Sequence, residues 1–163
     1  LGVFENYYPH FCETPKSMLY AVEDKFDGVS FGSEMLNGKI DRIEKLSDGT
    51  YALYDYKTSS PTSKNQYREG GQREDYYNQL CCYKYAFEKK TGVKVSQVGV
   101  IYVENHTKSV ILELTEEDMK YIEALVIDTY KNIRCLNYEV PASIADKACA
   151  WCGYKELCKL DVI

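Results

Sequence analysis

The sequence has 163 residues, the size of one domain that is long enough to bury a sizeable core. Its residues are 45% apolar and 13% aromatic, and its net charge is −5. This charge argues against a broad basic surface, although a few local cations could still contact phosphate groups. No run of about 18 apolar residues occurs, so no membrane span is expected.

The cysteines indicate the compartment. There are seven, an odd number, and Cys81 and Cys82 are adjacent on a predicted helix. This usage is typical of a reducing interior rather than of a disulfide framework, so we expect a cytoplasmic protein. The sequence begins at Leu1 without Met or a signal peptide. We therefore expect a single domain over residues 1–163 that is a fragment lacking upstream helices.

Three strands are predicted near the start of the chain, at residues 18–26, 34–46 and 50–57. The last two are joined by Ser47-Asp-Gly-Thr, a strong turn signal, and should pair as neighbours. Because side chains alternate along a strand, Asp55 and Lys57 point to one face and Tyr54 and Tyr56 to the other.

Asp41 lies in the second of these strands, and its carboxylate can reach the face that carries Asp55 and Lys57. Two carboxylates so close repel unless a cation lies between them, and hard oxygen ligands favour Mg²⁺ or Mn²⁺. Lys57 would then orient or deprotonate a metal-bound water. The alternative is a solvated strand edge with a weak ion pair. A charge in an otherwise apolar strand favours the metal site, because burial without a partner is costly.

Residues 58–75 form a polar loop with Pro61, Gly70 and Gly71, long enough to be functional. A helix follows, because four apolar or aromatic residues recur at spacings of four, three and four: Tyr76, Leu80, Tyr83 and Phe87. Gln79 and Tyr83 share one side of this helix, which by itself indicates ordinary packing.

Two further strands are predicted at residues 97–103 and 109–114. Thr115-Glu-Glu-Asp is a capping box for a second helix. The expected core stripe of that helix consists of Met119, Ile122, Val126, Thr129 and Ile133. Together the elements predict an α/β fold, with a mixed central β-sheet flanked by helices.

A cysteine-rich segment lies near the C-terminus at residues 146–160 and contains Cys149, Cys152 and Cys158. A Cys-x₂-Cys pair with a third cysteine six positions later indicates a metal or iron–sulfur site. We expect this segment to form a C-terminal clasp.

The sequence resembles the PD-(D/E)xK nuclease superfamily, and within it the RecB/AddB-like nuclease domains that are often fused to DNA helicases. The resemblance covers about residues 18 to 160. It rests on Val22-Glu-Asp-Lys-Phe, Leu36-Asn-Gly-Lys-Ile-Asp-Arg-Ile, Tyr54-Asp-Tyr-Lys-Thr and Gln79-Leu-Cys-Cys-Tyr83, in this order. It implies a restriction-endonuclease-like core.

The resemblance also implies roles for the site residues. Asp41 and Asp55 would bind Mg²⁺ or Mn²⁺, with the backbone carbonyl of Tyr56 as a further ligand. Lys57 would position the attacking hydroxide or stabilise the transition state. The helix would fix the site geometry or contact DNA through Gln79 and Tyr83. Independently of the resemblance, the loop at residues 58–75 follows Lys57 directly and would cover DNA, with phosphate contacts from Lys64, Arg68 and Arg73 or from a partner domain.

In the resembling family the C-terminal cysteine trio joins one upstream cysteine to hold a 4Fe–4S cluster. Cys12 is the only cysteine on the N-terminal side, but it lies closer to the first strand than the family pattern requires. Zinc is the alternative metal. The family's upstream histidine has no match, because His10 and His106 lie in unsuitable contexts.

We therefore expect a Mg²⁺- or Mn²⁺-dependent deoxyribonuclease, an exonuclease that acts in DNA repair or recombination, with a helicase domain or subunit as a possible partner. A CRISPR-associated exonuclease of the same superfamily is one alternative. A nuclease-like DNA-binding or structural module without turnover is another. The third is a zinc-stabilised protein-interaction domain in which the cysteines are the only functional site.

Overall fold

The computed structural model describes residues 18–104, 109–137 and 152–153. The chain divides into two compact units, Leu1–Ile127 and Asp128–Ile163. The sheet and the helix that crosses it belong to the first unit. The prediction of one domain over residues 1–163 stays a prediction.

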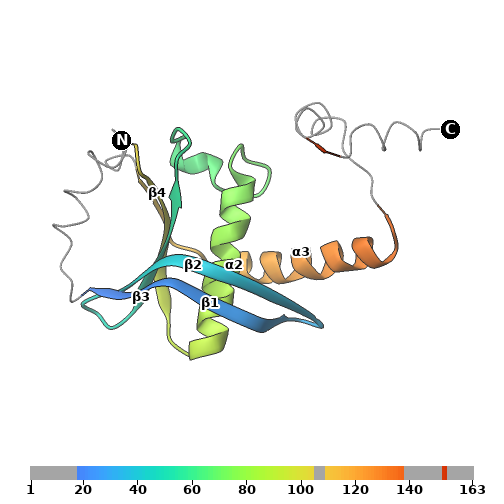
Figure 1. Ribbon diagram of the computed structural model, residues 1–163, viewed down its shortest axis with the longest axis horizontal. Coiled ribbons are helices and arrows are strands. Elements are labelled where there is room, and N and C mark those ends of the chain that lie inside the picture. Colours follow the sequence, from blue (N-terminus) through green and yellow to red (C-terminus); the bar gives the residue numbers. More distant parts are fainter. Residues whose placement is uncertain (1–17, 105–108, 138–151, 154–163) are drawn as a thin grey trace. The chain divides into compact units, whose positions relative to one another are not determined.

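The sheet has five strands in the order β1-β2-β3-β4-β5 (Figure 1). Their bounds are Leu19–Phe31, Glu34–Lys45, Tyr51–Lys57, Val95–Tyr102 and Val110–Leu112. β3 and β4 are parallel, and the other neighbouring strands are antiparallel. Helix α2 (Glu74–Thr91) makes the crossover that a parallel pair requires. The predicted α/β fold with a mixed sheet and flanking helices is confirmed, and it is consistent with a restriction-endonuclease-like core.

The strand bounds differ from the predicted ones mainly in β1, which continues to Phe31 instead of ending at Phe26. Asp27-Gly28 resembles a turn in the sequence. In the structure these residues form an irregularity in the strand between Phe26 and Val29, and β1 pairs with β2 again from Val29 onward. β5 is shorter than predicted, and β4 begins two residues earlier.

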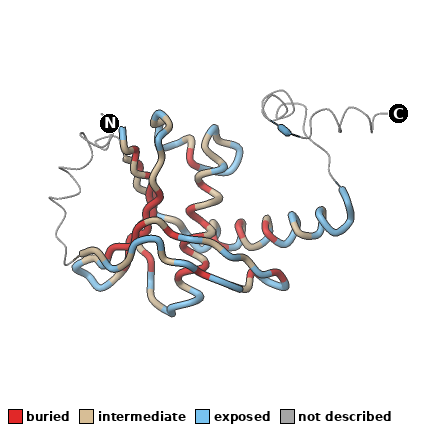
Figure 2. Tube along the Cα trace, viewed as in Figure 1, coloured by how far each residue is buried: buried red, intermediate tan, exposed pale blue. Residues whose placement is uncertain are grey.

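The core lies between the sheet and α2, which contacts β1, β3 and β4. Figure 2 shows the buried residues concentrated along the sheet and α2. Fully buried side chains include Phe31, Ile43, Leu53, Leu80, Phe87, Val98 and Val100. Burial of each such side chain contributes roughly 1.5–3 kcal/mol, so this contact fixes α2 over β3.

Polar contacts hold the C-terminal half of α2 against the start of β4. The buried Lys84 donates to the Val95 carbonyl at 2.6 Å and to Glu88 Oε1 at 2.9 Å, and the same Glu88 oxygen accepts the Val95 N–H at 2.8 Å. The helix ends at Gly92, whose φ of 72° is the left-handed conformation that glycine adopts without strain.

Helix α3 (Glu116–Arg134) begins with the predicted capping box, because Thr115 Oγ1 accepts the Asp118 N–H at 3.3 Å and Asp118 Oδ2 accepts the Thr115 N–H at 2.6 Å. Its predicted core stripe is confirmed at Met119, Ile122 and Val126. It is wrong at Thr129 and Ile133, which are exposed. Periodicity predicts the apolar face of a helix, but not how far the covering surface extends. No helix in the described part of the chain is long and apolar enough to span a membrane.

Candidate active site

The two candidate metal acids lie where β2 and β3 stop pairing. The ladder between these strands ends at Arg42 and Tyr54. Beyond that pair, Asp41 Oδ2 accepts the backbone N–H of Tyr56 at 3.0 Å, as a ladder carbonyl would. The strands therefore separate at this point, and the gap brings Asp41 to the face of β3 that carries Asp55.

Four side chains form a closed ring on this face. Asp55 Oδ2 lies 2.8 Å from the Lys57 ammonium, which donates to Gln79 Oε1 at 2.9 Å. Gln79 Nε2 in turn donates to the Tyr83 hydroxyl at 2.8 Å, and that hydroxyl donates to Asp55 Oδ1 at 3.2 Å. β3 therefore supplies the charged pair and α2 the two neutral side chains that hold it.

The ring is largely buried, and burial sets its electrostatics. Asp55 is only 3% exposed, and desolvation raises the pKa of its carboxyl group. Lys57 opposes this rise, whereas the charge of Asp41 adds to it. Burial and the Asp55 charge also raise the pKa of Tyr83, so its hydroxyl keeps its proton near neutral pH and remains a donor.

The donor set fits a hard divalent cation. Asp55 Oδ2 is buried, and among the described residues its one polar contact is the ion pair with Lys57, without a well-directed hydrogen bond. The charge of Asp41 raises the pKa of Asp55, so a second carboxylate lies near the pair that Asp55 forms with Lys57. Among the described residues no group of three Asp, Glu, His or Cys side chains gathers, so a metal here would complete its shell with backbone carbonyls or water.

Tyr76 belongs to the site, although its sequence pattern indicated only packing. The Lys57 ammonium lies 4.6 Å from the centre of its ring, and the Arg73 guanidinium lies 5.2 Å from the same centre. Its hydroxyl is 3.1 Å from Ser59 Oγ. The signal that could have revealed it is its position three residues before Gln79, on the same helix face.

The predicted DNA-binding cations are not part of the ring. Lys64 and Arg68 are exposed. Arg73 donates to the Ser60 carbonyl at 3.0 Å and contacts the Tyr76 ring, so it connects the loop after β3 to the start of α2.

The cysteine site is largely outside the described residues. Cys12, Cys149 and Cys158 lie there, as do His10 and His106, while Cys152 is described and exposed. Within α2, burial raises the pKa of Cys81 to about 12 and that of Cys82 to about 11, so both stay as thiols. The ligand role of the four candidate cysteines stays a prediction.

The sequence model of the PD-(D/E)XK nuclease superfamily matches residues 4–159. The chain belongs to this superfamily. Asp55-Tyr56-Lys57 fits the (D/E)XK part of the superfamily's name, and Asp41 lies on the preceding strand. No protein among curated sequences matches the chain.

Among solved structures, the fold is similar to the crystal structure of a candidate exonuclease from Eubacterium rectale. The TM-score is 0.56 at 16% sequence identity, over 95% of this chain and 59% of the other. At this identity the likeness shows the fold alone. The nuclease-superfamily chain described here spans about three fifths of that protein's length.

Proposed function

We propose that this chain is a Mg²⁺- or Mn²⁺-dependent deoxyribonuclease that hydrolyses phosphodiester bonds as an exonuclease. The observation that carries the proposal is the closed ring of Asp55, Lys57, Gln79 and Tyr83 beside Asp41, in a member of a nuclease superfamily. A buried acid with incomplete charge compensation favours a cation site over a structural ion pair.

Asp41 and Asp55 would hold the metal, and the Tyr56 carbonyl is a suitable third ligand. In an extended strand the N–H and C=O of one residue point to the same edge. The Tyr56 N–H points to Asp41, and the next carbonyl, that of Lys57, bonds to β4 through the Val103 N–H. A bound Mg²⁺ or Mn²⁺ would lower the pKa of its water and neutralise charge on the phosphate.

Lys57 would act on the attacking water and on the developing negative charge. Its ammonium is held from three sides, by Asp55, by Gln79 and by the Tyr76 ring, so its direction is fixed before substrate binds. Gln79 and Tyr83 position Lys57 and Asp55 rather than react, because each uses its polar groups within the ring. Contacts with phosphates alone predict weak sequence preference.

The test is incubation of the full chain with 5′-labelled linear duplex, linear single-stranded and closed circular DNA, with Mg²⁺, Mn²⁺ or EDTA. We expect metal-dependent shortening of linear DNA from its ends, with circular DNA spared. Asp55→Asn should be inactive, and Asp48→Asn in the exposed β2–β3 turn is the matched control. Cutting of circular DNA would contradict exonuclease action. No cleavage of any substrate would indicate a non-catalytic module.

The resemblance to helicase-associated nuclease domains also supports a role in DNA repair or recombination, with a helicase domain or subunit as partner. The odd number of cysteines supports a cytoplasmic location. Copurification of the full-length protein with a DNA-dependent ATPase activity would test this partner. Absence of such an activity from the whole protein and its complexes would contradict it.

We further propose that Cys149, Cys152 and Cys158 bind a 4Fe–4S cluster, with Cys12 as the candidate fourth ligand. The spacing of the trio supports this, and zinc is the alternative. A brown sample with matching iron and sulfide would favour the cluster, and a colourless sample with zinc would contradict it. Full iron occupancy after Cys12→Ser would show that Cys12 is not a ligand.

A further inference from the structure

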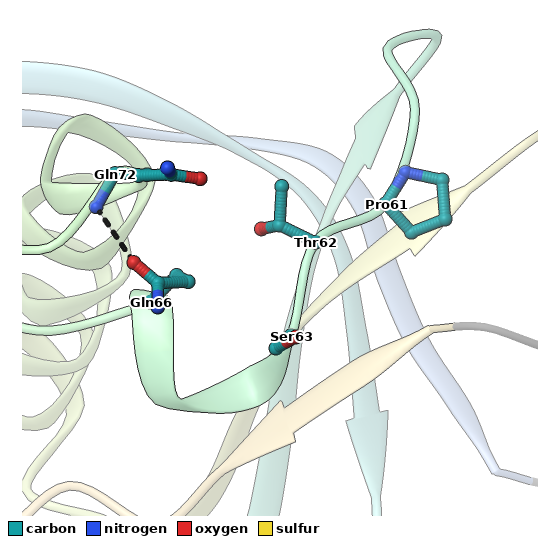
Figure 3. Close-up of a pocket in the computed structure, with 5 residues that line it drawn as sticks. All are labelled: Pro61, Thr62, Ser63, Gln66 and Gln72. Carbon is teal, nitrogen blue, oxygen red and sulfur yellow. Dashed lines mark hydrogen bonds between the residues drawn. The ribbon is translucent and has the colours of Figure 1, made fainter.

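A polar pocket of about 550 Å³ opens in the segment between β3 and α2 (Figure 3). It is lined by Pro61, Thr62, Ser63, Gln66 and Gln72. Figure 3 shows Thr62 on one side of the pocket, with its hydroxyl oxygen facing the two glutamine side chains on the other side. None of the lining residues is charged, which distinguishes this pocket from the ring around Asp55.

The pocket segment is fixed beside the catalytic lysine at both ends. Tyr67 follows the short helix η1 (Lys64–Gln66), and its hydroxyl bonds to that of Tyr102, the residue paired with Lys57 in the sheet. At the other end, Arg73 lies on the same Tyr76 ring that contacts Lys57. Both ends of the segment that lines the pocket are therefore attached to residues that pair with or contact Lys57.

The pocket wall is preformed by backbone contacts. Gln66 N–H donates to the Ser63 carbonyl at 2.9 Å, and the Gln66 carbonyl accepts the Arg73 N–H at 3.1 Å. Gly71 packs so closely that a Cβ atom there would lie 2.2 Å from the Gln66 carbonyl oxygen. Only glycine permits this approach, so the two sides of the loop are held together without a ligand.

The lining groups have unused hydrogen-bonding capacity. Thr62 Oγ1 is buried, and no partner for it occurs among the described residues. In the described part of the chain the Gln66 amide makes two long contacts: Oε1 accepts the Gln72 N–H at 3.3 Å, and Nε2 donates to Asn65 Oδ1 at 3.4 Å. Neutral hydroxyl and amide groups are donors and acceptors that suit the edge of a nucleobase.

We propose that this pocket holds one nucleobase of the DNA strand, next to the phosphate that is cleaved. The inference rests on the proposed nuclease function and adds a nucleotide subsite to it. The volume lies within the usual range for small-ligand sites, roughly 300–1,000 Å³. The exposed Lys64 and Arg68 lie in the same segment and would contact the phosphates that flank the held base.

Binding without cleavage tests the pocket independently of catalysis. Single-stranded oligonucleotides, each with one abasic position, would be titrated in EDTA with fluorescence anisotropy. We expect one abasic position near the strand end to weaken binding by the wild-type chain. Gln66→Ala and Gln72→Ala should each weaken binding of the intact strand about fivefold, and should lose sensitivity to that position. Equal binding of intact and abasic strands by the wild-type chain would overturn the proposal.

Thr62→Val separates binding from folding, because it removes the unpaired hydroxyl and keeps the side-chain shape. It should leave the thermal stability unchanged or higher while it weakens strand binding. Gln97→Ala on β4 is the matched control and should bind as the wild type does. Weakened binding by Gln97→Ala, or unchanged binding by Thr62→Val together with both glutamine variants, would contradict the assignment.

Cleavage distinguishes failure of the pocket from failure of the nuclease proposal. Bis(4-nitrophenyl) phosphate has a scissile diester but no nucleobase. The glutamine variants should raise KM for an oligonucleotide and hydrolyse this ester at the wild-type rate. Equal losses on both substrates would overturn the subsite. If the wild type cleaves neither substrate, the nuclease proposal fails, and the anisotropy titration still decides the pocket.

Discussion

The two faces of the β2–β3 pair both contain buried charges, but the charges are balanced differently. On the face away from α2, the buried Arg42 lies 2.5 Å from the buried Glu44 and donates to the Tyr56 hydroxyl at 3.2 Å. Among the described residues, Arg42 is the cation that pairs with Glu44 there. On the α2 face, Asp55 pairs with Lys57, and the charge of the nearby Asp41 raises the pKa of Asp55 further.

The comparison shows that burial of a charge does not by itself mark a functional site. Glu44 is a buried acid that pairs with Arg42, so the cost of removing its charge from water is offset by a partner within the chain. Such a pair has a structural role. Asp55 has a raised pKa and a second carboxylate nearby, so a further cation would stabilise its ionised form. The excess of negative charge, rather than the depth of burial, distinguishes the candidate metal site.

Removing both acids of the α2 face should have the largest effect. In the double variant Asp41→Asn, Asp55→Asn the charge that holds a cation is lost. We expect nuclease activity to fall by at least roughly a thousandfold, because a metal contributes several kcal/mol to the transition state. Isothermal titration calorimetry should show loss of Mn²⁺ binding. Unchanged Mn²⁺ binding would show that the site assignment is wrong.

Removing the Lys57 ammonium from the same face should lower the rate of hydrolysis without removing metal binding. Lys57→Ala should lower kcat by about 10²–10⁴-fold, the range for loss of a positioned proton-transfer group. Mn²⁺ binding should persist, since both carboxylates remain. Lys94→Ala, at an exposed lysine before β4, is the control and should keep full activity. If Lys57→Ala abolished Mn²⁺ binding and kept the fold, Lys57 would be part of the metal site instead.

Breaking the pair on the opposite face should affect stability and leave chemistry intact. Glu44→Gln leaves the Arg42 charge without its carboxylate, and we expect a loss of about 3 kcal/mol in the free energy of unfolding. Urea denaturation measures this loss. Activity per folded molecule should stay within about twofold of the wild type. A large activity loss without a stability loss would place Glu44 in the functional site.

Local sequence patterns were sufficient to predict much of the site. Alternation along β3 placed Asp55 and Lys57 on one face, and the Ser47–Thr50 turn made β2 its neighbour, which brought Asp41 close. The helix spacing placed Gln79 and Tyr83 together on α2. Both results depend on the regular periods of strand and helix, which a single sequence contains.

The rest depends on tertiary contacts that no local period encodes. The Tyr76 ring between Lys57 and Arg73 requires the loop after β3 to fold back on α2. The pocket at Thr62 depends on the close approach of Gly71 to Gln66. Likewise, the exposed Ile133 shows that the apolar stripe of α3 continues beyond its covered part. The glycines and polar residues of the loop at residues 58–75 predict a loop, but not which distant residues it contacts.

The smallest expected effect concerns the stability of the metal-free protein. Burial raises the pKa of Asp55 from its ordinary value of 3.8, so the folded state binds this proton more tightly than the unfolded state does. Stability from this group is therefore present at low pH, and is lost as the pH rises from 3.8 through the raised pKa of the folded state. Asp55→Asn removes that loss, because an amide does not ionise.

Calorimetry of the metal-free proteins should therefore show no difference due to this group near pH 3, and a higher melting temperature for Asp55→Asn at pH 7. Added Mn²⁺ should reverse the order, because it stabilises only the chain that binds it. A structural pair would behave differently, since loss of its acid would destabilise the fold at pH 7 with or without metal. A lower melting temperature for metal-free Asp55→Asn at pH 7 would thus place Asp55 with Glu44, as a compensated charge that needs no cation.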